Sequence, residues 1–597
     1  MMDEKLMIKY FLRIFLYAFL FLGNLVFAES KLDEIVITPS KRPTTIFNSL
    51  TSVQVITKED IRNSGFQDVH EIFDSISSIS IGSNGGHGQT KSIFMRGTES
   101  NHTKVLIDGI ELNPSTLGVP SIQHISTDMI ERVEISNGSM STLYGKNTIG
   151  GVINIITRNR GEESNKIKFS SGRDETNRIN IFRYFSKNNH TFFIDYSKTQ
   201  SDGFKAKPTS NKNHLYKNDN INANYSYNNK DDVFKISFYQ SDGKTEYDSY
   251  GSNLSQDHKD RNTKLSWTRN NKDSLSKLAF IDKQNKIDQA DLSATDYTHT
   301  KVNQFIFEKN YYDLLNTNTI LGGSYTDEAV YELSYGTSFR ETNNIRELFF
   351  QSEYLINAVT NMNFGSRFIN HDSYGDYFTG NMNFSYLIDK KTIFSGGIGK
   401  SFRPPDGTDK FGYGGNENLN PEKSISSELS LKRRVTKNGD FVMTFFNNSI
   451  TNLIESDGAK MQNINKARIT GIEFNYNTSF DKYDYSFNYT YQLADDLTNN
   501  TMLSRRPKNK FTGKILYQIN PNDNAGIIFI GEGERDNSIY DNHKLGSYLL
   551  FNAIYNRKID QYDLSLKVNN LFDKKHRKAH NYNSEGRSFY LGVTTSF

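Results

Sequence analysis

The chain has 597 residues, no cysteine, a formal net charge of +3 and a mean hydropathy of −0.64. The lack of cysteine excludes disulfide bonds, thiol catalysis and cysteine metal sites, and the small charge does not indicate nucleic-acid binding. The 34 tyrosines, 42 phenylalanines and 41 glycines, against only 10 prolines, favour a very large β structure.

The first 28 residues have the pattern of a cleaved export signal. Lys5, Lys9 and Arg13 precede the apolar run IFLYAFLFL at 14–22, and VFA at the end of the segment is an acceptable cleavage site. The alternative is a membrane anchor, but the run is shorter than the roughly 20 residues that a spanning helix needs. We expect export with cleavage near Ala28, and no later segment is apolar enough to span a bilayer as a helix.

A short strand-forming segment, KLDEIVITPSKRP, occupies residues 31–43. Its IVIT stretch has strand composition, and Pro39 ends the strand because proline has no backbone N–H to donate. Two interpretations stay open. The segment is either a first edge strand of the following domain or a handle kept free for pairing with another protein.

Residues 50–158 mix helical and strand patterns. TKED at 57–60 is a capping box, and the apolar residues of 69–76 recur with helical spacing. TKVLIDGIEL at 103–112 predicts a hairpin with an Asp-Gly turn, and GGVINIITR at 150–158 predicts another strand. We therefore predict a small α+β domain, preceded by an N-terminal segment at 29–49.

From residue 159 to residue 597 the pattern is that of a transmembrane barrel. Apolar and polar residues alternate in segments of about ten, as in DKYDYSFNYTYQL at 481–493. A water-soluble sandwich would alternate too, but the export signal, the number of segments and the many interfacial aromatic residues disfavour it. At roughly 20 residues per strand and connection, residues 159–597 predict about 22 antiparallel strands, a size whose lumen is plugged. We expect an all-β membrane barrel with the domain at 50–158 as its plug.

Seven motifs resemble those of TonB-dependent outer-membrane receptors, and together they extend over essentially the whole mature chain. They are DEIVITPS at 33–40, SIFMRGTESNHTKVLIDGIELN at 92–113, LYGKNTIGGVINIITR at 143–158, FRPP at 402–405, NENLNPEKS at 416–424, KARITGIEF at 466–474 and NNLFDKKH at 569–576. The resemblance implies a Gram-negative outer-membrane location in contact with lipid, a monomer, no nucleic-acid partner and no enzymatic activity.

Within this family the chain is most similar to the subgroup that transports cobalamin (vitamin B12). The motifs that carry this similarity are NGGHGQTKSIFMRGT at 84–98, GYGGNENLNPEKS at 412–424, INKARITGIE at 464–473 and VNNLFDKK at 568–575. The resemblance implies active import of cobalamin or a related corrinoid. The alternatives are an iron siderophore, haem (disfavoured because 402–421 contains no histidine) and, in another class, a passive porin or an adhesin, which would not need a plug with a TonB box.

The resemblance also assigns roles to particular residues. It implies that the TonB box pairs with the TonB protein by strand addition and consists of Asp33, Glu34, Ile35, Val36, Ile37 and Thr38. It implies ligand contacts from two plug loops and from the external part of the barrel, at Thr90, Ser92, Glu99, Leu117, Gly118, Ser249, Thr295, Arg505 and Tyr540. The alternative for the TonB box is an edge strand of the plug, and the alternative for the ligand contacts is a set of ordinary solvated loop residues.

No cofactor is required by this assignment, but the resemblance implies an optional Ca²⁺ held by loop carboxylates, which is the oxygen chemistry that this ion prefers. The candidate ligands are Asp248, Asp260 (or Asp257) and Asp219. Lys205 occupies a position where the subgroup has an acidic residue, which weakens the assignment. The alternative is an acidic solvated loop.

Finally, the resemblance implies an ion-pair lock between plug and barrel. Family members commonly have Arg-Gly-Pro where residues 136–138 of this chain are Ser-Asn-Gly. The retained plug arginine and the matching barrel carboxylates are Arg96, Glu428 and Glu473. We hypothesise that the plug keeps one ion-pair centre at Arg96 and that one wall carboxylate needs another partner.

Overall fold

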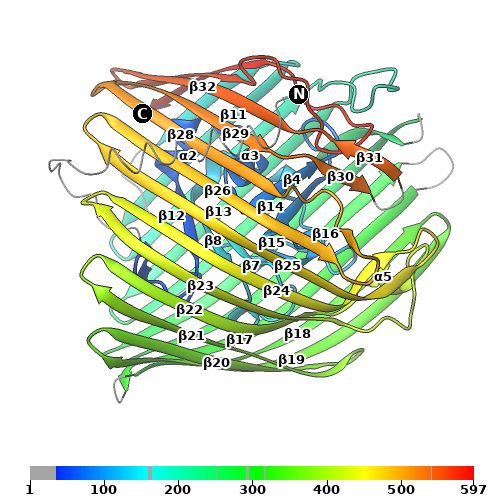
Figure 1. Cartoon of the computed structure of the whole chain (residues 1–597). Helices are drawn as coiled ribbons and strands as arrows, with labels where there is room; N and C mark the ends of the chain where they lie inside the picture. Colours follow the sequence, from blue (N-terminus) through cyan, green and yellow to red (C-terminus); the bar gives the residue numbers. More distant parts are fainter. Residues whose placement is uncertain (1–34, 159–164, 250–251, 291–294, 315–316, 539–540) are drawn as a thin grey trace.

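The computed structural model describes residues 35–158, 165–249, 252–290, 295–314, 317–538 and 541–597. The expected export signal and the first two residues of the expected TonB box, Asp33 and Glu34, lie outside these ranges. A long-stranded barrel surrounds a smaller mixed domain (Figure 1). In the described part of the chain, no helix is long and apolar enough to cross a bilayer.

Over the described residues, the barrel is a closed antiparallel sheet of 22 strands, as predicted. The strands are β10 (Lys166–Gly172), β11 (Thr176–Lys187), β12 (His190–Ser201), β13 (Tyr216–Asn229), β14 (Asp232–Ser249), β15 (Ser252–Asn271), β16 (Ser274–Ala290), β17 (Thr295–Leu314), β18 (Thr317–Ser334), β19 (Thr337–Asn357), β20 (Thr360–His371), β21 (Gly375–Asp389), β22 (Thr392–Arg403), β23 (Glu422–Thr436), β24 (Gly439–Ser456), β25 (Met461–Phe480), β26 (Tyr483–Asp496), β28 (Asn509–Asn520), β29 (Asp523–Glu532), β32 (Tyr548–Ile559), β33 (Tyr562–Asn569) and β34 (Ser588–Ser596). β10 closes the ring on β34, from the pair of Lys166 with Ser596 to the pair of Gly172 with Tyr590.

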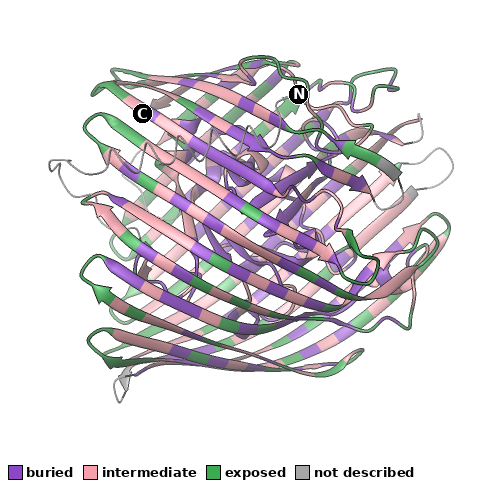
Figure 2. Cartoon of the chain, viewed as in Figure 1, coloured by how far each residue is buried: buried purple, intermediate pink, exposed green. Residues whose placement is uncertain are grey.

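Burial alternates along the barrel strands, because successive side chains of a strand point to opposite faces (Figure 2). On β19, Leu348 is 67% exposed on the outer face while its neighbour Phe349 is 5% exposed and points inward. The outer face therefore presents an apolar band to its surroundings, and the inner face packs on the plug.

The two ends of the barrel differ. At one end the strands are joined by turns of about two residues, such as 188–189, 230–231 and 390–391, and we call this the short-turn end. At the other end lie much longer connections, including 404–421 and 570–587, and we call this the long-loop end. Short periplasmic turns and longer extracellular loops are typical of outer-membrane barrels.

Three of the long connections carry elements of their own. These are α5 (Gly407–Phe411), β27 (Thr501–Met502) and the hairpin of β30 (Arg535–Ser538) with β31 (Asp541–Leu545). They lie over the opening of the barrel, where the two candidate ligand loops of the plug end.

The plug is built on a mixed sheet of strand order β3-β8-β9-β6-β7, with a separate hairpin of β4 and β5. Its strands are β3 (Val53–Thr57), β4 (Ile79–Ser83), β5 (Lys91–Met95), β6 (Thr103–Ile107), β7 (Ile110–Glu111), β8 (Ile130–Asn137) and β9 (Gly151–Thr157). Its helices are α2 (Lys58–Ser64), α3 (Val69–Asp74) and α4 (Ser141–Tyr144), with 3₁₀ turns η1 (Ser100–His102), η2 (Ile122–His124) and η3 (Thr127–Met129). Apolar side chains of α3 and of the sheet form one buried core.

Two local predictions in the plug are confirmed. The side chain of Thr57 accepts a hydrogen bond from the backbone N–H of Asp60 (3.1 Å), and the Asp60 carboxylate accepts one from the backbone N–H of Thr57 (3.1 Å), which is the predicted capping box. The predicted hairpin is β6–β7, with Asp108 and Gly109 in the left-handed region at φ +49° and +79°.

Candidate functional site

The β4–β5 loop of the plug ends at the long-loop end of the barrel. The Gln89 side chain donates a hydrogen bond to the backbone carbonyl of Glu246 (2.5 Å), three residues before the long-loop end of β14. Thr90 is exposed and Ser92 is half-buried. Both candidate ligand residues therefore lie where a molecule arriving from outside meets the plug.

A buried lysine fixes the shape of this loop. The Lys91 ammonium donates hydrogen bonds to the Ser83 hydroxyl (2.6 Å) and to the carbonyl oxygens of Gly85 (2.7 Å) and Gly86 (3.1 Å). Burial lowers the pKa of Lys91 to about 8. Sequence reasoning missed this residue, although it lies between the two candidates Thr90 and Ser92.

Glu99 is held by the barrel. Its carboxylate pairs with Arg506, whose Nε also donates to the carbonyl of Gly97 (3.1 Å). The Glu99 backbone N–H donates to Nδ1 of His102 (3.2 Å), so Nε2 of that imidazole carries the proton and donates to Glu422 (2.6 Å). A ligand that reaches Glu99 therefore touches a residue already tied to the barrel wall.

The Glu422 carboxylate links this part of the plug to α5. It also accepts a hydrogen bond from Nε of Arg403 (2.6 Å), and the same guanidinium binds Asp409 in α5 (2.9 Å). Arg403 belongs to the FRPP motif and Glu422 to the NENLNPEKS motif. The opposite charges of these two motifs could have predicted this ion pair from the sequence.

The second candidate loop of the plug contains Leu117 and Gly118. Leu117 is 39% exposed, and Gly118 has φ +68° with so little space that an added Cβ would lie 2.9 Å from Cβ of Asn101. The amide of Asn113 closes the loop by donating to the Gly118 carbonyl (2.8 Å).

The connection that carries α5 covers this second loop. The backbone N–H groups of Gly407 and Thr408 donate to the carbonyls of Ser115 (3.1 Å) and Thr116 (3.0 Å). These main-chain bonds place α5 directly beside Leu117, so a ligand bound there would contact both the plug and an external connection of the barrel.

The barrel candidates are more dispersed. Ser249 is half-buried at the last position of β14. Arg505 lies at φ +65° and its Nε donates to the Asn537 carbonyl (3.1 Å), so it supports strand β30 of the β30–β31 hairpin. Thr295 begins β17, but its side chain lies outside the described residues, as does Tyr540 entirely.

The three candidate calcium ligands do not converge. Asp248 accepts a hydrogen bond from the Ser210 hydroxyl (2.8 Å) and pairs with Lys207 (3.4 Å). Asp260 is opposite Ser241 in the β14–β15 register, seven residues from Asp248, or about 23 Å along the strand.

The third candidate, Asp219, and the alternative candidate, Asp257, also lie beside lysines and not beside the other candidate carboxylates. Asp219 pairs with Lys198 (3.6 Å), and Asp257 is opposite Lys244. Within the described residues, no group of three or more His, Asp or Glu side chains could hold a metal. The structure does not bring Asp248, Asp260 and Asp219 together, because Asp248 and Asp260 lie far apart along the β14–β15 pair and Asp219 lies on β13.

The described part of the expected TonB box is docked rather than free. Ile35 and Val36 form β1, which pairs with β2 (Thr44–Thr45), and Val36 is completely buried. The buried Glu134 carboxylate of β8 accepts hydrogen bonds from the backbone N–H groups of Ile37 (3.0 Å) and Thr38 (2.7 Å) and from the Thr38 hydroxyl (2.6 Å).

The residues that follow the box anchor it to the barrel wall. Lys41 pairs with Glu308 of β17, and Arg42 pairs with Glu353 of β19. Both carboxylates lie near the short-turn ends of their strands, since β17 ends at Leu314 and β19 ends at Asn357. The docked segment therefore lies at the end of the barrel opposite to the candidate ligand loops.

The predicted lock residues come together. Arg96 at the end of the β5 hairpin donates from Nε and Nη2 to the two oxygens of Glu473 (2.7 and 2.8 Å) and from Nη1 to Glu428 (2.9 Å). One guanidinium serves both wall carboxylates, and Glu428 also has the additional partner that we hypothesised, because its Oε1 accepts a hydrogen bond from the backbone N–H of Ser52 (3.2 Å). Burial alone would lower the pKa of Arg96, but Glu473 and Glu428 outweigh it and raise that pKa.

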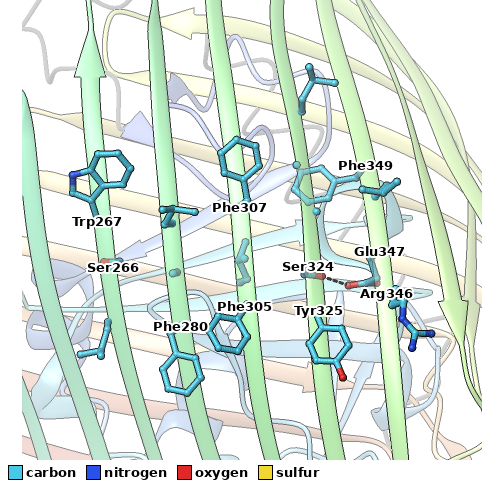
Figure 3. Close-up of a pocket in the computed structure, with 18 of the residues that line it drawn as sticks. Ser266, Trp267, Phe280, Phe305, Phe307, Ser324, Tyr325, Arg346, Glu347 and Phe349 are labelled. Atoms are coloured by element: carbon cyan, nitrogen blue, oxygen red, sulfur yellow. Dashed lines mark hydrogen bonds between the residues drawn. The ribbon is translucent and has the colours of Figure 1, made fainter.

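A hollow of the outer surface, about 1670 Å³, is not part of this site (Figure 3). It lies against strands β13 to β21, and Phe305 and Phe307 in it are 57% and 47% exposed on the outer face. Figure 3 shows Phe280, Phe305 and Tyr325 on neighbouring strands along this wall. An apolar outer wall of this kind suits lipid chains rather than a polar ligand.

Comparisons with known proteins extend over nearly the whole chain. The model of the TonB-dependent receptor plug domain matches residues 45–152, and that of the TonB-dependent receptor-like β-barrel matches residues 163–571. The vitamin B12 transporter BtuB of Photobacterium profundum is 28% identical over 602 residues, with 96% of this chain and 98% of that protein covered. BtuB of Vibrio vulnificus is 24% identical over 600 residues, with 95% of each covered.

Solved structures show the same fold at lower identity. The siderophore receptor PirA from Acinetobacter baumannii superposes with a TM-score of 0.80 at 18% identity, with 91% of this chain and 98% of PirA covered. A mutant of the ferric enterobactin receptor PfeA from Pseudomonas aeruginosa gives 0.81 at 18% identity, with 92% and 99% covered. At this identity the likeness concerns the fold alone.

Proposed function

Because this chain belongs to the TonB-dependent receptor family, whose members are outer-membrane receptors rather than enzymes, we propose that it imports cobalamin or a related corrinoid. Members of the family bind a ligand and interact with TonB. In this proposal the long-loop end faces outward and captures the ligand, and the short-turn end presents the TonB box to the periplasm.

The observation that carries the proposed coupling is the docking of Ile35–Thr38 at the short-turn end. The segment is held by one two-residue strand pair, by hydrogen bonds to Glu134, and by the side chains of Tyr144 and Asn154, which donate to the carbonyl (3.0 Å) and the hydroxyl (3.2 Å) of Thr38. A partner strand could replace the strand pair and the hydrogen bonds to backbone groups. Strand addition uses backbone donors and acceptors of this kind. Energy for transport would come from TonB pulling on the plug, since neither plug nor barrel holds an energy source.

The choice of corrinoid rests on two supports. The relatives that are 24% and 28% identical over at least 95% of their length are named as vitamin B12 transporters. The plug also presents hydroxyl groups and exposed backbone at Thr90 and Leu117, which suit a large ligand with scattered amide groups. An iron siderophore is the alternative ligand. Because receptors for both ligands share this fold, a binding measurement is needed to decide between a corrinoid and a siderophore.

The coupling is tested by uptake of labelled cyanocobalamin into cells that lack their own transporter. Val36→Pro removes a backbone donor from the box, so we expect no uptake and unchanged binding of cyanocobalamin to the purified protein. Thr44→Pro, in the strand that pairs with Val36, is the matched control and should keep uptake. If Val36→Pro cells import normally, or if both variants lose uptake equally, the segment acts as an edge strand of the plug and not as a handle.

A further inference from the structure

Four basic side chains cluster on the outer face of the barrel near the long-loop end. They are Lys400 on β22, Lys423 on β23, and Lys466 and Arg468 on β25, and we call them the basic patch. All four are exposed, while the alternate residues of the same strands, such as Ser424 and Ala467, are buried against the interior. The patch therefore points away from the plug and the candidate ligand site.

The strand register places these cations close together. Lys423 is opposite Thr451 of β24, and Thr451 is opposite Lys466, so two strand spacings of about 4.8 Å separate the two lysines. One row further from the long-loop end, Lys400 and Arg468 lie at the same level across β22 to β25, about 14 Å apart. Figure 1 shows these four strands side by side on one wall of the barrel.

The height of the patch on the wall matches a lipid headgroup. The exposed apolar residues Leu429 and Phe445 are opposite each other in the apolar band. Lys400 is opposite Ile425, four residues from Leu429 toward the long-loop end, which is about 13 Å along the strand. For strands tilted by about 40° this is about 10 Å along the membrane normal, where the hydrocarbon of the outer leaflet gives way to headgroups.

The basic patch is not neutralised by protein carboxylates. In the described part of the chain, none of its four side chains has an acidic group within 4 Å, and Asp495, opposite Arg468 on β26, is beyond that distance. The opposite wall differs, because Lys259 pairs there with Asp242 (3.3 Å) and Arg261 with Asp282 (3.3 Å). Like charges placed together on a sheet repel each other unless an anion lies between them.

We propose that the basic patch binds the phosphate groups of anionic lipids in the outer leaflet. Four cations above an apolar wall match a molecule with a negative headgroup and hydrocarbon chains. The site is independent of the proposed corrinoid, since it lies on the other face of the barrel wall.

The test compares two variants of the full-length purified protein in detergent. The patch variant carries Lys400→Gln, Lys423→Gln, Lys466→Gln and Arg468→Gln. The control carries Lys198→Gln, Lys244→Gln, Lys259→Gln and Arg261→Gln, which removes the same charge from the opposite wall, on β12, β14 and β15. Binding of phosphatidylglycerol and of phosphatidylcholine is measured by native mass spectrometry, and circular dichroism checks that the barrel is folded.

We expect the patch variant to bind phosphatidylglycerol at least tenfold more weakly, the control to change less than twofold, and phosphatidylcholine binding to be equal in all proteins. Equal loss in both variants, or no loss in the patch variant, would overturn the proposal. Displacement of phosphatidylglycerol by millimolar inorganic phosphate would show a site for free phosphate and would overturn the assignment to lipid. If the fourfold variant does not fold, the two double variants, Lys400→Gln with Lys423→Gln and Lys466→Gln with Arg468→Gln, must each weaken phosphatidylglycerol binding at least threefold.

Discussion

Arg96 of the plug donates two parallel hydrogen bonds to the two carboxylate oxygens of Glu473 on the barrel wall, at 2.7 and 2.8 Å. The pair is bidentate and buried, with the Glu473 side chain fully shielded from solvent. Glu428 on β23 accepts a third hydrogen bond, from Nη1 of Arg96, at 2.9 Å. One guanidinium thus fixes the end of β5 that is remote from the β4–β5 loop against strands β23 and β25.

Arg96→Ala should loosen the plug within the barrel. The substitution leaves the buried Glu473 carboxylate and the half-buried Glu428 carboxylate without their cation, and loss of one partner of a buried ion pair costs roughly 3–5 kcal/mol. We expect faster hydrogen exchange in peptides of 79–98, with the barrel strands unaffected. Glu428→Gln is the milder control because the bidentate pair with Glu473 remains. Unchanged exchange in Arg96→Ala would show that this ion pair does not hold the plug.

Glu134→Gln should release the docked box. An amide keeps one acceptor oxygen but loses the charge that strengthens three hydrogen bonds to Ile37 and Thr38, so we expect a loss of about 1.4 kcal/mol, or a tenfold larger open fraction. Because the chain has no cysteine, Val36→Cys gives a single labelling site that is buried when docked. Its reaction rate with a polar maleimide should rise about tenfold.

Glu131→Gln is the matched control for that experiment. Glu131 lies on the same strand β8, and its carboxylate is partly exposed and pairs with Lys58 (3.5 Å) instead of the box. Labelling should stay at the wild-type rate in this variant. Equal rates in the Glu134 and Glu131 variants would mean that Glu134 does not control access to the box.

Ligand binding should not depend on calcium. The Asp248 carboxylate already binds Lys207 and Ser210. Asp260 lies far from it along the β14–β15 pair, and Asp219 lies on β13. We expect the same dissociation constant for cyanocobalamin in 1 mM CaCl₂ and in 1 mM EGTA. A dissociation constant that rises on removal of calcium would show that external loops rearrange to bring other oxygen ligands together.

The β4–β5 loop should become less ordered as pH rises. Burial disfavours a charged His87, but Asp68, 2.8 Å away, outweighs burial and raises the pKa of His87 above 6.5. A raised pKa means that the stabilisation is fully present below pH 6.5 and is lost as pH rises through the folded-state value. Hydrogen exchange at 84–90, corrected for its intrinsic pH dependence, should accelerate over this range. In His87→Gln the corrected rate should not vary over the part of this range that lies below the titration of Lys91, whose pKa is about 8, and a flat wild-type profile there would contradict the assignment.

Much of the architecture follows from local patterns in the sequence. Alternation such as that of Tyr483 and Asp484 depends only on one face being apolar, so it predicts strands and their number without tertiary knowledge. The capping box at Thr57 is local in the same way. These features can be predicted from the sequence because they form without contacts to distant segments of the chain.

The site was only partly predictable, because its geometry depends on contacts between distant segments. Asp248 and Asp260 are close in sequence, yet the β14–β15 register separates them by about 23 Å. Arg505 has the chemistry of a ligand contact but is used to support the β30–β31 hairpin. Conversely, Lys91 and Glu134 act through buried contacts, at 2.6–3.1 Å, that no sequence spacing reveals.

The most direct test of the central proposal is equilibrium binding of cyanocobalamin to the purified, detergent-solubilised protein. We predict saturable binding at one site per chain, weakened at least tenfold by Leu117→Asp, which places a charge at the exposed tip of the second plug loop. A ferric siderophore should not compete. Absence of cyanocobalamin binding, together with tight binding of a ferric siderophore, would leave the family assignment intact and contradict the assigned ligand.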